Sequence, residues 1–331
     1  MKEEIYKYIE KYGPIRPSTI LRAINTSEVT LFKVLKYLLE SEAIKKDGRD
    51  SGVYYYVNNQ KIVNNKDRKI LDTIKDFDKY IIDKNYIYVD PVGNIIRGIQ
   101  GFQIWCSKVN LNIETEVKSY VKFIKDLNKI KKNGAIEAKK NILSQNKNKE
   151  IHLNQIFYSD FYNVGHYGKT RLGQLVYVAK SAQNKSLIKE IAKDIYSTLV
   201  KIVEDKNIKY IAYIPPTIKR QVQFISELEK SLHLVEDFNL TKLKIEKIKS
   251  ETLIAQKTLK KLEDRIYNAN HTIIVNPNQI INGNVLLIDD ATGSGATLNE
   301  TAKKIKAISD HKVYGYSIVG SMKGFDVINE I

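Results

Sequence analysis

The segment NVLLIDDATGSGATL, residues 284–298, constrains the fold of this chain more than any other segment. Its four apolar residues, Val285–Ile288, predict a buried central strand of the kind found in parallel sheets. Two carboxylates, Asp289 and Asp290, follow at the C-terminal end of that strand, where open α/β sheets bind ligands. A loop of small residues then leads into a helix predicted over residues 298–307. This order predicts an α/β domain with a ligand site at one edge of its sheet.

The loop after the two aspartates has the composition of an anion site. Gly293 and Gly295 let the backbone approach a ligand closely, and successive N–H groups at a helix N-terminus bind anions. Thr292, Ser294 and Thr297 add hydroxyl donors. The loop therefore favours a phosphate, while the acidic pair favours hydroxyl groups or a cation. A sugar phosphate satisfies both.

The 331 residues are enough for two or three domains, and the sequence pattern divides them into three regions. Residues 151–331 alternate strands and helices, as an α/β sheet does. Residues 59–150 are interpreted as a mostly helical connector or dimerisation element. The predicted helices of these two regions are Lys66–Asp76, Glu114–Lys132, Ala135–Gln145, Thr170–Lys180, Lys185–Val203 and Phe224–Leu232, and the further predicted strands are Tyr86–Val89, Tyr210–Ile214, Leu234–Phe238 and Val313–Val319.

Residues 1–58 form the remaining region, whose pattern predicts three helices followed by a hairpin of two short strands. Ser27 is placed to cap the third helix. The helical spacing predicts an inward face of Val29, Phe32, Leu35, Leu38 and Leu39, and an outward face of Thr30, Lys33 and Lys36.

The charge of the chain favours an anionic partner. Lys and Arg number 54 against 38 Asp and Glu, a formal net charge of +16 that attracts nucleic acids and phosphorylated metabolites. A/T-rich coding also produces abundant Ile, Lys and Asn, which is a second explanation for part of the excess of basic residues.

The single cysteine, Cys106, excludes an internal disulfide and a cysteine-based zinc site. Because no long apolar run or apolar leader is present, we expect a cytoplasmic protein without membrane contacts.

Residues 284–298 resemble the 5-phosphoribosyl-1-pyrophosphate (PRPP) motif of type I phosphoribosyltransferases, in which apolar residues, two acids and a TTGAT-like loop occur in sequence. The resemblance narrows to the competence-protein-F-like (ComF-like) branch, because YIAYIPPTIKRQVQF, residues 210–224, is similar to that branch's proline-bearing loop and RGFNQ-like stretch. Tyr167–Lys180 is similar to the branch's tyrosine-to-lysine segment. A later pattern of the family is matched in order by Gln256, Leu259, Arg265 and Asn268. The similarity covers about residues 155–331 and implies a parallel sheet flanked by helices.

The resemblance implies transfer of phosphoribosyl from PRPP, with Mg²⁺ as cofactor, to an acceptor. Asp289 and Asp290 would hold the ribose hydroxyls directly or through Mg²⁺ and stabilise the cationic sugar. Arg265, or a lysine among Lys257, Lys260 and Lys261, would close over the site. The residues expected to bind PRPP are Thr292, Gly293, Ser294, Gly295, Ala296 and Thr297 on the phosphate side, and Pro216, Thr217, Lys219 and Arg220 on the pyrophosphate side.

The chain departs from the family pattern in three places. It has no cysteine-rich zinc ribbon, its phosphate loop reads GSGAT, and RGFNQ has become RQVQF with the loss of a glycine. The acceptor is not indicated, because Val235–Lys242, where related enzymes vary their acceptor hood, has no base-binding signature.

Residues 1–58 resemble a winged helix-turn-helix domain. The resemblance implies that the third helix enters a major groove and that the wing contacts phosphates. The nucleic-acid-binding residues would be Ser27, Thr30, Lys33 and Lys36 on the helix, and Lys45, Lys46 and Arg49 on the wing. Nearby acids, including Glu28 and Glu40, favour the alternative of a protein-docking module.

Three functions follow as alternatives. The first is a phosphoribosyltransferase tethered to nucleic acid or to a protein partner. The second is a DNA-binding regulator that senses PRPP or a nucleotide without turnover. The third is an effector of a nucleic-acid-controlled defence system. With each of these functions, the chain could also form a homodimer or a larger complex.

Overall fold

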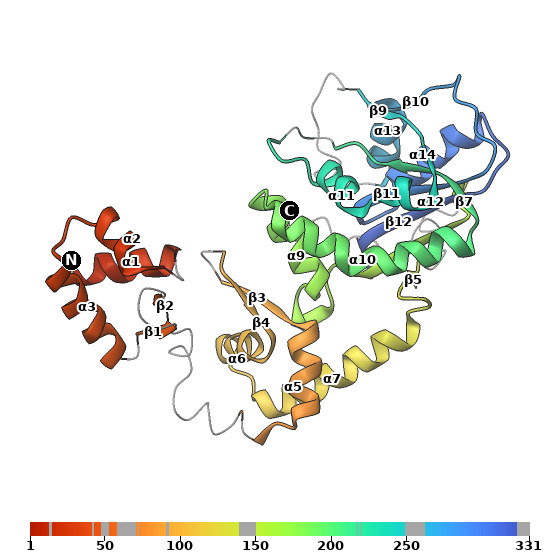
Figure 1. The fold of residues 1–331 in the computed structure, drawn as a ribbon. Coiled ribbons are helices and arrows are strands. Elements are labelled where there is room, and N and C mark those ends of the chain that lie inside the picture. The colour runs from red at the N-terminus through yellow and green to blue at the C-terminus, as the bar shows by residue number, and fades with distance from the viewer. Residues whose placement is uncertain are drawn as a thin grey trace. The chain divides into compact units, whose positions relative to one another are not determined.

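The computed structural model describes residues 1–12, 15–41, 43–47, 53–57, 71, 73–90, 93–138, 150–216, 218, 220–248 and 262–322. The chain divides into two compact units, Met1–Lys75 and Asp76–Ile331. Figure 1 colours the first unit red and runs through the second from orange to blue.

The described part of unit Met1–Lys75 contains three helices and a hairpin. The elements are α1 (Lys2–Tyr12), α2 (Pro17–Ala23), α3 (Glu28–Glu40), β1 (Ile44–Asp47) and β2 (Tyr54–Val57). The two strands are antiparallel, and Ile15 forms an additional antiparallel bridge with Tyr55. The Ser27 hydroxyl accepts a hydrogen bond from the Thr30 N–H at 3.2 Å, which confirms the predicted cap of α3.

The predicted inward face of α3 is wrong at two positions. Leu31, Leu35 and Leu38 are buried against the other helices, whereas Val29 is 80% exposed and Phe32 is 43% exposed. The buried leucines follow the i, i+4, i+7 spacing of one helical face. Val29 lies two residues from Leu31, about 200° around the helix, so it faces away from the core.

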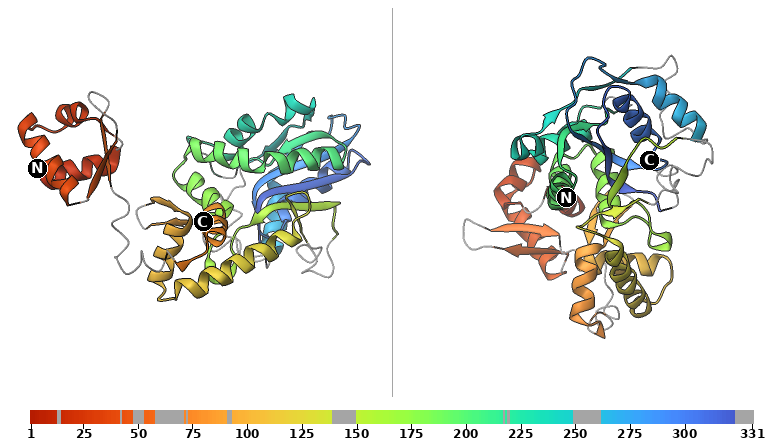
Figure 2. Two further views of the ribbon diagram at one scale, coloured as in Figure 1. Left: turned by 60° about the horizontal axis from the view of Figure 1, so that its bottom comes forward. Right: turned by 90° about the vertical axis from the view of Figure 1, so that its right-hand side faces the viewer.

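Unit Asp76–Ile331 is built around a six-stranded sheet of order β5-β6-β12-β11-β7-β8. The strands are β5 (Ile136–Glu137), β6 (Gln155–Phe161), β7 (Ile208–Tyr213), β8 (Thr241–Lys242), β11 (Asn284–Thr292) and β12 (Val313–Gly320). Only the β5–β6 pair is antiparallel among them. In Figure 2 the blue strands β11 and β12 run side by side within this sheet. The predicted α/β class with a mostly parallel sheet is confirmed.

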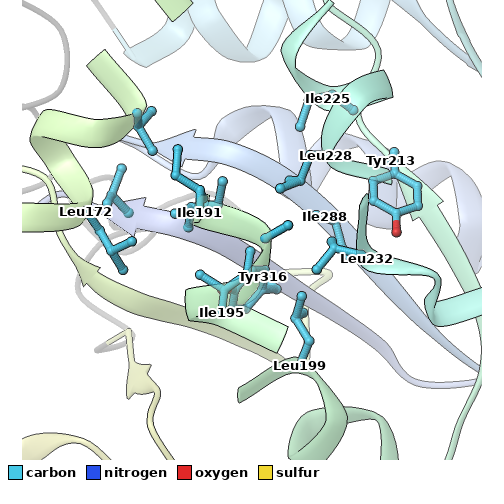
Figure 3. Close-up of a cluster of buried hydrophobic side chains, with 14 of the residues drawn as sticks. Leu172, Ile191, Ile195, Leu199, Tyr213, Ile225, Leu228, Leu232, Ile288 and Tyr316 are labelled. Carbon is cyan, nitrogen blue, oxygen red and sulfur yellow. The ribbon is translucent and has the colours of Figure 1, made fainter. Parts of the chain in front are cut away.

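Both faces of the sheet are covered, which explains the apolar run in β11. Leu286 and Ile288 point to a core shared with α9 (Arg171–Ser181), α10 (Lys185–Asp205) and α11 (Phe224–Leu232). Figure 3 shows this core around Ile288. Val285 and Leu287 point to the opposite core, which α14 (Ala296–Lys306) covers. Alternate side chains of a strand face opposite sides, so a strand covered on both sides is apolar throughout.

Residues 76–138 pack within the same unit as the sheet. Their elements are α5 (Asp76–Asn85), β3 (Ile87–Val89), β4 (Ile95–Arg97), α6 (Gly98–Lys108) and α7 (Ile113–Ile130). Aromatic rings attach them to the η3 turn (Gly165–Tyr167) that precedes α9: Tyr120 meets Tyr167 edge-on with centroids 5.0 Å apart, and Trp105 lies 5.6 Å from Tyr167. The remaining elements are α12 (Leu234–Phe238), β9 (Ile245–Lys247), α13 (Leu262–Thr272) and β10 (Ile273–Val275).

Two predicted elements are wrong. Leu234–Phe238, predicted as a strand, is the short helix α12, bounded by His233 and Asn239 in the left-handed conformation. Within the predicted helix Ala135–Gln145, residues 136–137 instead form β5, because the left-handed Gly134 turns the chain onto the edge of β6. Residues 139–149, and the predicted helix Lys66–Asp76 for its larger part, lie outside the described residues.

Replacing Gly320 by alanine is expected to destabilise the unit. Gly320 lies at the end of β12, where an added Cβ would overlap the ring of the fully buried Tyr158. Overpacking of this kind costs about 1–3 kcal/mol of unfolding free energy, which chemical denaturation measures. Gly315→Ala on the same strand is the control, since its Cβ would lie 3.2 Å from Leu298 Cδ1, the movable end of a side chain. An equal loss in both variants would contradict the expectation.

Candidate functional site

The carboxyl ends of parallel strands bring the predicted site segments to one edge of the sheet. The Ser321 N–H, directly after β12, donates to the Thr292 carbonyl at 2.9 Å. The Ile214 N–H, directly after β7, donates to the Ile288 carbonyl at 2.8 Å. The loop after β7 and the acidic end of β11 are therefore neighbours, at the edge where α/β sheets bind ligands.

Two lysines accompany the acidic pair. Lys180 Nζ on α9 lies 2.7 Å from Asp290 Oδ2, and the two side chains are only 10% and 18% exposed. Lys247, at the end of β9, interacts electrostatically with both Asp289 and Asp290. The pair is thus surrounded by positive charge from two elements outside its own strand–loop–helix unit.

Burial controls the protonation of this cluster. It raises the pKa of Asp289 to about 7, and the neighbouring Asp290 carboxylate raises it further. The Asp290 N–H, which donates to Asp289 Oδ1 at 2.8 Å, and the two lysines oppose the shift. Burial also lowers the pKa of Lys247, against the attraction of the two aspartates. Near neutral pH, Asp289 can therefore exchange a proton.

The resemblance implies Mg²⁺ at this acidic pair, held mainly by substrate oxygens and water, and the side chains found around the pair do not favour a divalent cation. Two ammonium groups already face the two carboxylates, so a divalent cation there meets like charge. Within the described residues, no three Asp, Glu, His or Cys side chains gather as metal ligands.

The loop after β11 forms the N-terminus of α14. Gly295 takes a left-handed φ of 74° at the cap position, which a side chain would disfavour. The first N–H groups of a helix lack intrahelical acceptors and bind anions. The Thr292 hydroxyl is hydrogen bonded to Ser317 inside the sheet, and the buried Ser294 hydroxyl accepts from the Ala296 N–H at 3.4 Å. The backbone of the loop, more than its hydroxyls, is therefore suited to an anion.

The loop after β7 is fixed to the end of α9. The Arg220 guanidinium donates to the backbone carbonyl of Lys180. The Gln223 amide donates to the Arg220 carbonyl at 3.2 Å and to the Ile218 carbonyl at 3.4 Å. Arg220, predicted for the pyrophosphate side, is thereby joined to the residue that pairs with Asp290. Pro215 and Pro216 lie in the same loop, whereas Thr217 and Lys219 are outside the described residues.

Arg265 lies on α13, which packs against α14. Its side chain is only 3% exposed, and burial lowers its pKa below the ordinary value. The predicted lysines Lys257, Lys260 and Lys261, together with Gln256 and Leu259, lie outside the described residues. The expected closure over the site therefore stays a prediction.

The expected acceptor segment lines a cavity. The cavity has a volume of about 420 Å³ and is bounded by α11, α12 and β8, with Tyr213, Glu229, Val235, Glu236 and Lys242 among its lining residues. Burial and the carboxylates of Glu229 and Glu236 raise the pKa of Tyr213, so its hydroxyl keeps its proton. A second cavity of about 220 Å³, lined by Pro215 and Pro216 of the loop after β7, shares Tyr213, Glu229 and Lys242 with the first.

The predicted nucleic-acid residues divide into two groups. Ser27 and Thr30 bond to each other through their hydroxyls at 2.8 Å, so both serve the cap of α3. Lys33, Lys36 and Lys46 are exposed and Lys45 is half-buried, whereas Arg49 lies outside the described residues. Sequence reasoning missed the exposed Val29 and Phe32 on the same helix.

The sequence pattern also indicates no function for Lys180 or Lys247, the two lysines at the acidic pair. Lys180 is 110 residues from Asp290 and ends a segment that was singled out only as a family likeness. Lys247 lies in a polar, lysine-rich stretch where no single residue stands out. Only the pairing of distant elements could identify either one.

A scan against models of known protein families finds no match to this chain, and a search of curated proteins finds no significant match. Among the helices in the described ranges, none is long and apolar enough to cross a membrane.

Asp289→Asn is expected to stabilise the protein more at about pH 8 than at about pH 5, because the folded state holds a proton on Asp289 that the unfolded chain has released. With a folded pKa of about 7 and an ordinary value of 3.8, the unfolding free energy falls as the pH rises between these values. Denaturant titrations at both pH values measure the difference, in which any pH-independent cost of the substitution cancels. The exposed Asp310→Asn is the control. A gain that is the same at both pH values would show that the Asp289 pKa is not raised.

Proposed function

We propose that residues 151–331 bind PRPP or a related ribose phosphate and transfer its phosphoribosyl group to an acceptor, and that the N-terminal unit binds nucleic acid. One observation carries the first part. A buried parallel strand, β11, carries two carboxylates near its C-terminal end and continues after Thr292, through a loop with a left-handed glycine, into the N-terminus of α14. The acids and the anion-binding backbone thus belong to one continuous segment.

The acidic pair suits the ribose ring. Carboxylate oxygens accept hydrogen bonds from sugar hydroxyls, and hydrogen bonds to charged groups are the stronger kind. The 5-phosphate is matched to the loop of residues 293–297, whose backbone N–H groups open α14. This division of roles needs no side chain from another domain.

Transfer would proceed at C1 of the ribose. The acceptor's electron pair forms the new bond to C1, while the C1–O bond breaks and its electrons leave with pyrophosphate. The sugar becomes cationic in the transition state, and the carboxylates of Asp289 and Asp290 stabilise that charge. Arg220, held on the Lys180 carbonyl, would neutralise the departing pyrophosphate.

Nucleic-acid binding would use the exposed face of α3 and the β1–β2 hairpin. Lys33, Lys36 and Lys46 are exposed for phosphate contacts. Val29 and Phe32 add apolar side chains to the same helix, and such groups contact the thymine methyl in a major groove. A protein partner is the competing occupant of this face.

Asp289→Asn combined with Asp290→Asn is expected to weaken PRPP binding by at least about 100-fold, because two hydrogen bonds to charged groups are worth about 1.5–3 kcal/mol each. Titration calorimetry with PRPP measures the affinity, and a melting curve verifies folding. The exposed Asp310→Asn is the control. An unchanged affinity in the double variant would remove the site assignment. Pyrophosphate release over a panel of acceptors then separates transfer from sensing, since a sensor binds PRPP and releases none.

Duplex DNA binding by the full chain is expected to weaken linearly with the logarithm of salt concentration. Lys33→Ala combined with Lys46→Ala should reduce that slope by about 2, one for each lost phosphate contact. The control is Lys7→Ala on α1, which removes an exposed lysine from a different helix. Fluorescence anisotropy at several salt concentrations gives the slopes. A chain that does not bind DNA, or binds it with an affinity that is insensitive to salt, would favour protein docking as the role of this unit.

A further inference from the structure

The ion pair between Lys180 and Asp290 is mostly buried and links α9 to β11 across 110 residues. Burying two charges is costly, and a buried pair is often no more stabilising than apolar residues of the same volume. Its position is the ligand-binding edge of the sheet and not the core. This combination indicates that the pair serves a ligand.

The end of α9 is built to hold positive charge. Lys180 lies in the last turn of the helix, where the backbone carbonyls favour a cation. Arg220 donates to the Lys180 carbonyl and so brings a second cation to the same helix end. The Lys180 ammonium, which comes from the last turn of this helix, is ion-paired with the Asp290 carboxylate.

Two lysines accompany the two acidic residues at this site. Asp289 and Asp290 supply two carboxylates, and Lys180 and Lys247 supply two ammonium groups that interact with them. Mg²⁺ prefers oxygen ligands in octahedral geometry and gives up its water reluctantly, and two neighbouring ammonium groups further oppose it. The lysines thus occupy the electrostatic position that a metal ion would take.

We propose that Lys180, assisted by Lys247, replaces a divalent cation at this site, so that the chain binds the sugar pyrophosphate without a metal ion. The inference rests on the proposed function, because it concerns the same site and ligand. An ammonium group has three N–H donors. One can remain on Asp290 while the others bind anionic oxygens of the pyrophosphate. Lys180 then contacts both the Asp290 carboxylate, which binds the ribose, and the pyrophosphate, which is the leaving group.

The test compares PRPP binding in magnesium chloride and in EDTA by titration calorimetry. We expect the wild-type Kd to differ by less than about threefold between the buffers. Lys180→Met should bind at least about tenfold more weakly in EDTA and recover in magnesium, because the metal can now enter. Lys180→Arg should keep metal-independent binding. Lys189→Met, an exposed lysine on the neighbouring helix α10, is the matched control.

Two results would overturn the inference. One is wild-type binding that weakens at least about tenfold in EDTA. The other is a folded Lys180→Met variant that binds weakly in both buffers, because a lysine that merely maintains the structure gives no recovery with metal.

A second measurement separates this inference from the proposed function. Mn²⁺ alone, followed by electron paramagnetic resonance, should not bind the wild-type site, whereas Lys180→Met combined with Lys247→Met should bind it. Wild-type binding of Mn²⁺ that Asp290→Asn abolishes would sink the inference even if PRPP binds. If folded wild-type protein binds no PRPP in either buffer, the proposed function fails, and the proposal that Lys180 replaces a metal for that ligand fails with it.

Discussion

Burial of β11 on both of its faces is the constraint on which the rest of the larger unit depends. The strand lies between β12 and β7, and its alternate side chains fill two separate cores. A strand in that position cannot shift its register by one residue without exchanging the side chains of both cores. The acidic pair near the C-terminal end of the strand and the loop that follows the strand are therefore fixed at the sheet edge, and α14 begins where the loop ends.

Electrostatics at that edge follows from the same arrangement. Parallel strands end together, so carboxylates at the end of β11 lie near the loop after β7 and the end of α9. Burial disfavours isolated charge, and the chain meets this with opposite charges from α9 and β9. Ionisable side chains with strongly shifted pKa values and charged partners are typical of ligand-binding sites. Here the helix end, the two carboxylates and the two lysines form one electrostatic system.

The sequence predicted what depends on local order, and it missed what depends on distant pairing. β11, α14, α11 and the Ser27 cap follow from periodicity and capping over short windows, and all are present, although β11 continues beyond the predicted Val285–Ile288 to Thr292 and so includes the acidic pair. Leu234–Phe238 was mistaken for a strand because five residues cannot distinguish the two periods. The buried face of α3 was misassigned because its apolar residues are compatible with two different faces. Only packing against α1 and α2 determines that Leu31, and not Val29, is buried. Lys180 was noted only as the end of a family-like segment and Lys247 not at all, since nothing near them in the chain indicates Asp290.

The position of the single tryptophan has a practical consequence. Trp105 lies among Tyr86, Phe102 and Tyr167, the rings that attach residues 76–130 to the turn before α9. Unit Met1–Lys75 contains no tryptophan. Intrinsic emission excited at the red edge of the indole band therefore originates wholly in the larger unit. The chain carries its own optical probe there, which distinguishes the melting of one unit from that of the other without a label.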